Sequence, residues 1–225
     1  MSPSGAERRA RLARARLMLL FTPELCPPGR PPLEVLARAL PHVDVVQVRI
    51  KETGQALAPA RATLEWTERV LALRAEVAPR VLVLVNDRPD VARTLGERVD
   101  GVHLGADDAP PELARELLGA EALVGLSTHT AAEVVAAEDR PVDYLGFGPV
   151  HATATKGYAG GLGAEAAWIA ARASSRPLFP IGGIDATNAG ELTEVGRAAV
   201  SRALLAAEDP ARAAEELLAL LSGDA

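Results

Sequence analysis

The sequence predicts an α/β fold, a (β/α)8 TIM barrel, on three observations. Eight short aliphatic runs alternate with segments of helical spacing along 225 residues. Most of these runs are continuously apolar, which is typical of parallel strands buried on both faces. The length also fits one barrel domain of roughly 200–250 residues. An open, doubly wound sheet has the same alternation of elements and is the alternative.

The aliphatic runs give the positions of the strands, and the spacing between them gives the helices. The expected strands are Met18–Phe21, Val43–Val48, Val81–Val85, Gly101–Leu104, Ala122–Leu126, Tyr144–Phe147, Leu178–Ile181 and Ala198–Val200. The expected helices are Pro32–Ala39, Leu57–Val77, Pro110–Leu118, Thr130–Ala137, Ala164–Ala173, Thr187–Glu194 and Pro210–Leu221. No linker interrupts the pattern, so we expect residues 1–225 to form a single catalytic domain, with residues 1–16 as a leading helix or arm.

Composition excludes several classes of partner. A net charge of −6 and only 3% aromatic residues argue against binding to nucleic acid. The apolar run before residue 22 is far too short to span a membrane. A single cysteine, Cys26, can form neither a disulfide nor a cysteine-based metal site within the chain. We therefore expect a cytoplasmic protein with small-molecule substrates; the sequence leaves open whether it forms a homo-oligomer.

In a barrel of this class, functional residues lie at the carboxyl ends of the strands. The second strand ends in Gln47-Val48-Arg49-Ile50-Lys51, where alternation puts Gln47, Arg49 and Lys51 on the same side. Two cations and an amide that face a barrel interior are costly unless an anion meets them. The pattern therefore indicates an anion site, and a charged strand end in solvent is the alternative.

Acidic residues follow the next two strands. Asn86 and Asp87 come after the third strand, and Asp107 and Asp108 after the fourth. Carboxylates that face one cleft are the usual ligands of Mg²⁺ beside a phosphorylated substrate. The alternative for Asp107 and Asp108 is an N-cap of the following helix.

The remaining strand ends are also suited to phosphate. Hydroxyls at Ser127, Thr153 and Thr155 could donate to an anion, and Lys156 precedes a glycine-rich stretch at 157–163. The loops after the seventh and eighth strands frequently bind phosphate through backbone N–H groups. The residues concerned there are Gly182, Gly183, Val200 and Ser201.

Lysine usage singles out two positions. The chain has 24 basic residues, yet only Lys51 and Lys156 are lysines, and both fall at predicted strand ends. A compact ammonium on a flexible stem is not interchangeable with a planar guanidinium at a tight phosphate site. The distribution therefore favours a role for both lysines in phosphate binding.

Taken in order, these segments resemble the thiamine-phosphate synthase family over nearly the whole barrel. Six motifs carry the resemblance: Gln47–Lys51, Asn86–Asp87, Asp100–Gly105, Gly125–His129, Gly148–Lys156 and Ile181–Ile184. The resemblance implies condensation of 4-amino-5-hydroxymethyl-2-methylpyrimidine diphosphate with 4-methyl-5-(2-phosphoethyl)thiazole, or its carboxylate. The implied products are thiamine phosphate and pyrophosphate, formed by Mg²⁺-assisted dissociative displacement.

The resemblance also assigns roles by position. It implies that Gln47, Arg49, Lys51 and Asn86 bind the pyrimidine diphosphate, and that Asp87 and Asp108 hold Mg²⁺. Ser127 would contact the pyrimidine or its diphosphate, and Thr153, Thr155 and Lys156 the thiazole and the pyrophosphate. Gly183, Val200 and Ser201 would bind the thiazole phosphate. Catalysis would rest on Lys156, Arg49, Lys51 and Ser127.

Two other functions compete with this one. A thiazole tautomerase of the same superfamily would need no Mg²⁺ and could use His129 as its acid or base. A non-catalytic ligand sensor on the same barrel would be expected to have lost its charged strand ends. Because Arg49, Lys51, Asp87 and Lys156 are all present, the sequence favours the synthase.

Overall fold

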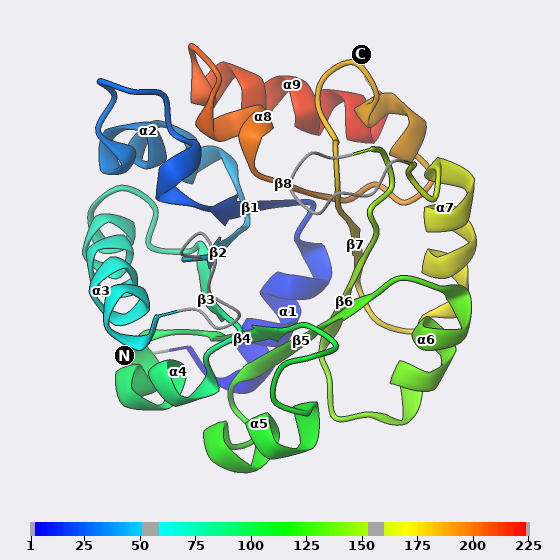
Figure 1. Cartoon of the computed structure of the whole chain (residues 1–225), viewed down its shortest axis with the longest axis horizontal. Helices are drawn as coiled ribbons and strands as arrows, with labels where there is room; N and C mark the ends of the chain where they lie inside the picture. Colours follow the sequence, from blue (N-terminus) through cyan, green and yellow to red (C-terminus); the bar gives the residue numbers. More distant parts are fainter. Residues whose placement is uncertain (1–2, 51–58, 153–159, 224–225) are drawn as a thin grey trace.

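The computed structural model describes residues 3–50, 59–152 and 160–223, and shows an eight-stranded parallel barrel surrounded by helices (Figure 1). Hydrogen bonds join the strands in the order β7-β6-β5-β4-β3-β2-β1-β8. A parallel bridge between Ile181 and Ala199 links the two outer strands. This consecutive order confirms the predicted (β/α)8 barrel, and the doubly wound sheet is wrong.

The strands lie where the aliphatic runs predict them. They are β1 Leu17–Phe21, β2 Val45–Val48, β3 Leu82–Asn86, β4 Gly101–Leu104, β5 Leu123–Thr128, β6 Tyr144–Phe147, β7 Leu178–Pro180 and β8 Ala198–Val200. Three of them match the expected bounds at both ends. β2 begins two residues later than the sequence predicts, because Val43 is the C-cap of the 3-10 turn η2, Leu40–His42.

The helices within the described residues are α1 Gly5–Arg14, α2 Pro32–Ala39, α3 Ala60–Val77, α4 Pro89–Leu95, α5 Pro111–Leu118, α6 Ala131–Ala136, α7 Ala164–Ala173, α8 Arg202–Leu205 and α9 Pro210–Ser222. Short 3-10 turns are η1 Pro23–Leu25, η3 Gly96–Arg98, η4 Ala137–Asp139 and η5 Ala189–Leu192. None of the described helices is long and apolar enough to cross a membrane.

One expected helix, Thr187–Glu194, is wrong: only the 3-10 turn η5 forms there. Asn188 and Gly190 explain why, because both are poor helix formers and the Asn188 side chain donates to the carbonyl of Gly183 at 2.9 Å. Two short helices, α4 and α8, were not predicted. Both are only a turn or two long, which is too short for an apolar period to be recognised in the sequence.

The barrel interior and the helix layer form two separate hydrophobic clusters. The larger lies between strands and helices and includes Phe21 and Phe147. The smaller fills the barrel, where Tyr144 and Phe179 pack with apolar side chains from β1, β2, β3, β5 and β8. Leu12 from α1 belongs to this inner cluster, so α1 closes one end of the barrel.

Aspartates fasten that amino-terminal end. One aspartate immediately precedes each of β2, β4 and β6, and its carboxylate accepts a backbone N–H at the start of the preceding strand. The pairs are Asp44 with Leu17 at 3.0 Å, Asp100 with Val83 at 2.8 Å, and Asp143 with Val124 at 2.8 Å. Two of these carboxylates also form ion pairs with α1: Arg8 lies 2.9 Å from Asp100 and Arg9 lies 2.7 Å from Asp143. These contacts hold the leading helix across the bottom of the barrel.

Before β8 the residue at this position is basic and not acidic. Arg197 stands there in place of an aspartate, and it donates to the carbonyls of Ala15 at 2.9 Å and Ala13 at 2.7 Å. The end of α1 is therefore held by an arginine that meets its exposed carbonyl groups. Within the segment expected to be a leading helix or arm, the structure thus has the helix α1 over Gly5–Arg14, packed against the barrel.

Replacing Asp100 with asparagine is expected to destabilise the fold by about 3–5 kcal/mol, because it leaves the buried Arg8 guanidinium without a counter-charge. Only 2% of the Asp100 side chain and 4% of the Arg8 side chain are exposed. Urea unfolding would measure the loss. The matched control is Glu112→Gln, which breaks the exposed pair with Arg140 and should cost less than about 1 kcal/mol. Equal losses for the two variants would contradict this account of the barrel floor.

Candidate active site

At the carboxyl ends of the strands, the barrel interior changes from apolar to polar. Gln47, Asn86 and His103 are buried there, with 2%, 5% and 8% of their surfaces exposed. They come from β2, β3 and β4, which are neighbours in the barrel. As the sequence predicts, polar side chains from separate strands are brought together at this end.

Four buried polar atoms at this end have no hydrogen-bond partner among the described residues: Thr22 Oγ1, Gln47 Oε1, Asn86 Nδ2 and His151 Nε2. A buried polar group without a partner costs about 1–3 kcal/mol, so such groups call for an explanation. Their common location at the barrel mouth indicates that a ligand supplies the missing partners. Thr22 was missed by the sequence reasoning, although a hydroxyl directly after the first aliphatic run was a signal for it.

Arg49 and Asp87 form the charged part of the site. Burial lowers the pKa of the Arg49 guanidinium, and the carboxylates of Asp87 and Glu24 oppose that shift. Asp87 has a φ of 61°, a left-handed conformation that is uncommon outside glycine, and its N–H donates to the carbonyl of His103 at 2.8 Å. The backbone of Asp87 is thus held in a strained conformation by the neighbouring strand, which is a common feature of functional sites. Lys51 lies outside the described residues.

Asp108 is fixed to the end of β4. One of its carboxylate oxygens accepts the N–H of Gly105 at 2.7 Å. The alternative that Asp107 or Asp108 caps α5 is wrong, because Pro110 holds the N-cap position without a side-chain hydrogen bond. Asp107 is exposed, whereas Asp108 is half-buried. Of the two aspartates, Asp108 is therefore the one whose carboxylate is held against the end of β4.

The described residues include no cluster of three or more His, Cys, Asp or Glu side chains arranged to hold a metal ion. Asp87 and Asp108 offer only oxygen ligands, which is the ligand type that Mg²⁺ requires. Mg²⁺ is commonly bound by one or two carboxylates, with waters and substrate phosphates completing the octahedron. The two aspartates therefore fit an ion that arrives with a phosphorylated substrate, and they do not form a complete cage.

Ser127 is joined to two buried rings. Its Oγ lies 2.9 Å from Nε2 of His103, and Nδ1 of the same ring lies 2.8 Å from the Tyr144 hydroxyl. Gly125 makes room for this arrangement, because a Cβ atom there would lie 2.1 Å from Cζ of Tyr144. The glycine of the Gly125–His129 motif is thus explained by packing inside the barrel.

At the ends of β7 and β8, on the opposite side of the mouth, backbone groups take the place of polar side chains. Gly182 and Gly183 have φ values of 104° and 63°, and a Cβ atom on Gly183 would lie 2.7 Å from the carbonyl oxygen of Ala152. The hydroxyl of Ser201 donates to the carbonyl of Leu20 at 2.7 Å, and the side chain of Val200 packs in the outer cluster. What Val200 and Ser201 can offer a ligand is therefore their backbone. Thr153, Thr155 and Lys156 lie outside the described residues.

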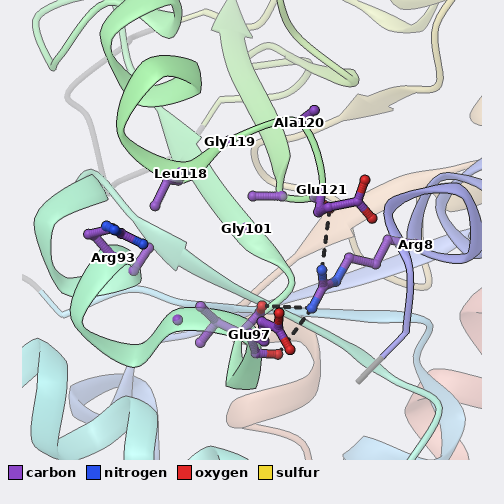
Figure 2. A pocket seen from close by; sticks show the side chains of 12 residues that line it. Arg8, Arg93, Glu97, Gly101, Leu118, Gly119, Ala120 and Glu121 are labelled. Carbon is purple, nitrogen blue, oxygen red and sulfur yellow. Dashed lines mark hydrogen bonds between the residues drawn. The ribbon is translucent and has the colours of Figure 1, made fainter. Parts of the chain in front are cut away.

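A second hollow lies at the other end of the barrel. This pocket of about 220 Å³ is lined by residues before β4 and β5 and by Arg8 of α1. Figure 2 shows the Arg8 guanidinium reaching toward Glu97 and Glu121, whose carbonyl oxygens it meets at 3.0 and 3.3 Å. Since the Arg8 charge is already paired with Asp100, the pocket belongs to the barrel floor and not to the polar mouth.

A (β/α)8 barrel whose polar and charged side chains meet at the carboxyl ends of its strands has the architecture of a barrel enzyme that acts on small molecules. The sequence model described as thiamine monophosphate synthase matches residues 17–204. The chain belongs to this family.

Individual relatives agree with the family match. The chain is 42% identical over 216 residues to a thiamine-phosphate synthase of Thermus thermophilus, a match that covers 92% of this chain and 98% of the relative. It is 40% identical over 216 residues to one from a Synechococcus species, covering 95% of this chain. The chain spans 58% of the length of that relative and of a similar one from Gloeobacter violaceus.

Solved structures show the same fold. Thiamine phosphate pyrophosphorylase from Pyrococcus furiosus superposes with a TM-score of 0.77 at 32% identity, covering 96% of this chain and 98% of that one. A 3-hexulose-6-phosphate synthase from Salmonella typhimurium, at 16% identity and a TM-score of 0.65, covers 93% of this chain and all of its own and shares the fold alone.

Proposed function

We propose that this chain is a transferase that joins 4-amino-5-hydroxymethyl-2-methylpyrimidine diphosphate to 4-methyl-5-(2-phosphoethyl)thiazole, or to its carboxylate. The products are thiamine phosphate and pyrophosphate, together with carbon dioxide where the carboxylate is the substrate, and residues 1–225 act as one catalytic domain. The observation that carries the proposal is the barrel mouth itself. In a member of this family, an unpartnered amide oxygen of Gln47 and an unpartnered amide nitrogen of Asn86 lie near the ends of β2 and β3, and Arg49 and Asp87 directly follow these strands.

The pyrimidine diphosphate binds on the side of β2 and β3. The free amide atoms of Gln47 and Asn86 supply one acceptor and one donor, which suits the edge of an aminopyrimidine. Arg49 and Lys51 meet the diphosphate. Asp87 and Asp108 hold Mg²⁺, which when bound neutralises charge on the diphosphate.

The reaction breaks the bond between the methylene carbon and the diphosphate oxygen, and the electron pair leaves with pyrophosphate. The electron-rich aminopyrimidine shares the positive charge that remains on the carbon. The thiazole nitrogen then donates its lone pair to that carbon and becomes the thiazolium nitrogen. Arg49, Lys51 and Lys156 stabilise the charge that develops on the leaving oxygens, and Ser127 adds a hydrogen bond.

The thiazole binds on the side of β6 to β8. Thr153, Thr155 and Lys156 contact the thiazole and the departing pyrophosphate. The backbone N–H groups of Gly183, Val200 and Ser201 bind the thiazole phosphate, in line with the frequent use of these loops for phosphate in barrels. The positive φ of Gly183 supports this role, because it permits close approach of the backbone to an anion.

A cytoplasmic location is part of the proposal. The lone Cys26 is half-buried, and burial raises the pKa of its thiol. A thiol of raised pKa is less reactive and fits a small apolar filler near β1 more than a redox site.

Incubation of the purified chain with both substrates and Mg²⁺ tests the proposal. We expect pyrophosphate and thiamine phosphate to appear in equal amounts, with the latter measured as fluorescent thiochrome after oxidation. The thiazole carboxylate phosphate should stay unchanged when incubated alone. Its isomerisation under those conditions would favour the tautomerase, in which His129 acts as acid or base. Release of neither product would overturn the proposed function.

A further inference from the structure

The hydroxyl of Ser127 ends a chain of hydrogen bonds that begins at a buried phenol. Tyr144 is fully buried inside the barrel, and its hydroxyl lies 2.8 Å from Nδ1 of His103. On the other side of the imidazole, Nε2 lies 2.9 Å from Oγ of Ser127. The three residues come from β6, β4 and β5, so the chain crosses three neighbouring strands at the mouth of the barrel.

Close packing holds the rings in place. A Cβ atom on Gly125 would lie 2.1 Å from Cζ of Tyr144, and one on Gly146 would lie 3.3 Å from Cε1 of His103. Phe179 packs edge-on against Tyr144 with ring centroids 5.9 Å apart. The absence of side chains at the two glycines is what allows these rings to lie inside the barrel.

The direction of the hydrogen bonds follows from the protonation state of the Tyr144 phenol. Burial raises the pKa of Tyr144, so it keeps its hydrogen, while a smaller opposing effect comes from a hydrogen bond with the Gln47 amide. The amide oxygen of Gln47 has no hydrogen-bond partner, so this hydrogen bond comes from the amide NH2 group, and Gln47 donates to the phenol oxygen. The Tyr144 hydrogen is then left to go to Nδ1 of His103. With Nδ1 as acceptor, a neutral imidazole carries its hydrogen on Nε2 and donates it to Ser127.

We propose that Tyr144 and His103 are positioning residues that fix the Ser127 hydroxyl as a hydrogen-bond donor toward an oxygen of the substrate's diphosphate. Because Ser127 Oγ accepts from His103, its own hydrogen points away from the ring and is free for an anionic acceptor. The inference rests on the proposed function for the identity of that acceptor. The orientation of the chain itself rests only on the geometry inside the barrel.

The opposite orientation is disfavoured on chemical grounds. If Nδ1 carried the hydrogen, the Tyr144 hydroxyl would have to donate to Gln47, whose amide would turn its oxygen toward the phenol. Ser127 would then donate to Nε2 and present only lone pairs to the substrate. An oxygen that presents lone pairs to a diphosphate would repel it, so this orientation does not suit the site.

The first test needs no substrate. In the full-length protein labelled with ¹⁵N-histidine, two-bond ¹H–¹⁵N correlation spectra report which imidazole nitrogen carries the hydrogen. The His103 signals are assigned by their loss in His103→Gln. We expect neutral His103 with its hydrogen on Nε2, and a change to a mixture of tautomers in Tyr144→Phe. A hydrogen on Nδ1, or on both nitrogens, in the unchanged protein would overturn the proposal, even if Tyr144→Phe fails to fold.

The second test is kinetic. Tyr144→Phe should lower the single-turnover rate about tenfold, with little change in KM for the pyrimidine diphosphate, because the hydroxyl is misdirected and not removed. In Ser127→Ala the same change should have no further effect. Phe147→Leu is the matched control, since Phe147 lies on the same strand but packs in the outer cluster. Its rate should stay within about twofold of the original.

Equal slowing by Tyr144→Phe in the presence and absence of the Ser127 hydroxyl would refute the positioning role. If the unchanged protein forms no thiamine phosphate at all, the proposed function fails, and the tautomer of His103 still decides the orientation of the chain. The two failures are therefore distinguishable.

Discussion

Asp87→Ala is expected to lower Mg²⁺-dependent turnover by at least about 1,000-fold, because it removes a proposed ligand of the ion that neutralises the diphosphate. Asp87 lies at the end of β3 and is not part of either hydrophobic cluster, so the barrel should still form. Alanine is less tolerant than aspartate of the φ of 61° at this position, so a small stability loss of about 1–2 kcal/mol is expected as well. Initial rates at a series of Mg²⁺ concentrations, alongside a thermal melt, measure both effects.

Two further variants make this result specific to the carboxylate. Asp87→Asn keeps a residue that accepts the left-handed backbone but removes the charge, and it should lose nearly as much activity. Asp107→Asn changes the exposed neighbour of Asp108 and should keep at least about half of the activity. Full activity of Asp87→Ala in the presence of a chelator would show that this residue has no part in metal binding.

Arg49→Ala is expected to lower kcat/KM for the pyrimidine diphosphate by about 100- to 1,000-fold. The guanidinium is held in a partly buried position where the carboxylates of Asp87 and Glu24 oppose the effect of burial on its pKa. A charge in such a position interacts with an anion far more strongly than a charge in open solvent. Steady-state rates over a range of pyrimidine diphosphate concentrations would measure the change.

Arg49→Lys should recover only part of this loss, since an ammonium cannot reproduce the two-pronged contact of a guanidinium with phosphate oxygens. Arg30→Ala is the matched control, because the Arg30 guanidinium is already engaged with the carbonyls of Ala207 and Glu208. Its kcat/KM should stay close to that of the unchanged protein. An unchanged kcat/KM in Arg49→Ala would remove Arg49 from the diphosphate site.

The fold was largely predictable because its main signal is local. Continuous aliphatic runs such as Tyr144–Phe147 need no partner to be recognised, and eight of them in alternation leave few architectures. The errors arose where local signals are weak. Residues 187–194 include Asn188 and Gly190, which are poor helix formers, and only the 3-10 turn η5 forms there. The helix α4 is only seven residues long, which is too short for its apolar positions, Val91, Ala92 and Leu95, to stand out as a helical period.

The site was predictable to the extent that strand ends define it. The alternation of Gln47 and Arg49 predicted a polar side chain facing inward, and Gln47 is indeed buried with a free amide oxygen. Contacts between distant residues could not be predicted in this way. Ser127 and Tyr144 meet through His103, and those contacts span 24 and 41 residues of sequence. They depend on the register of three strands, which no local pattern specifies.

The central claim is that the ends of β2, β3 and β4 form the diphosphate and metal half of a two-substrate site. A crystal structure of the chain with pyrophosphate and Mn²⁺, in which anomalous scattering locates the metal, tests it most directly. The account predicts one strong metal peak beside the carboxylate of Asp87, with pyrophosphate between that ion and Arg49. A metal bound away from Asp87, or pyrophosphate in the pocket near Arg8 at the other end of the barrel, would contradict it.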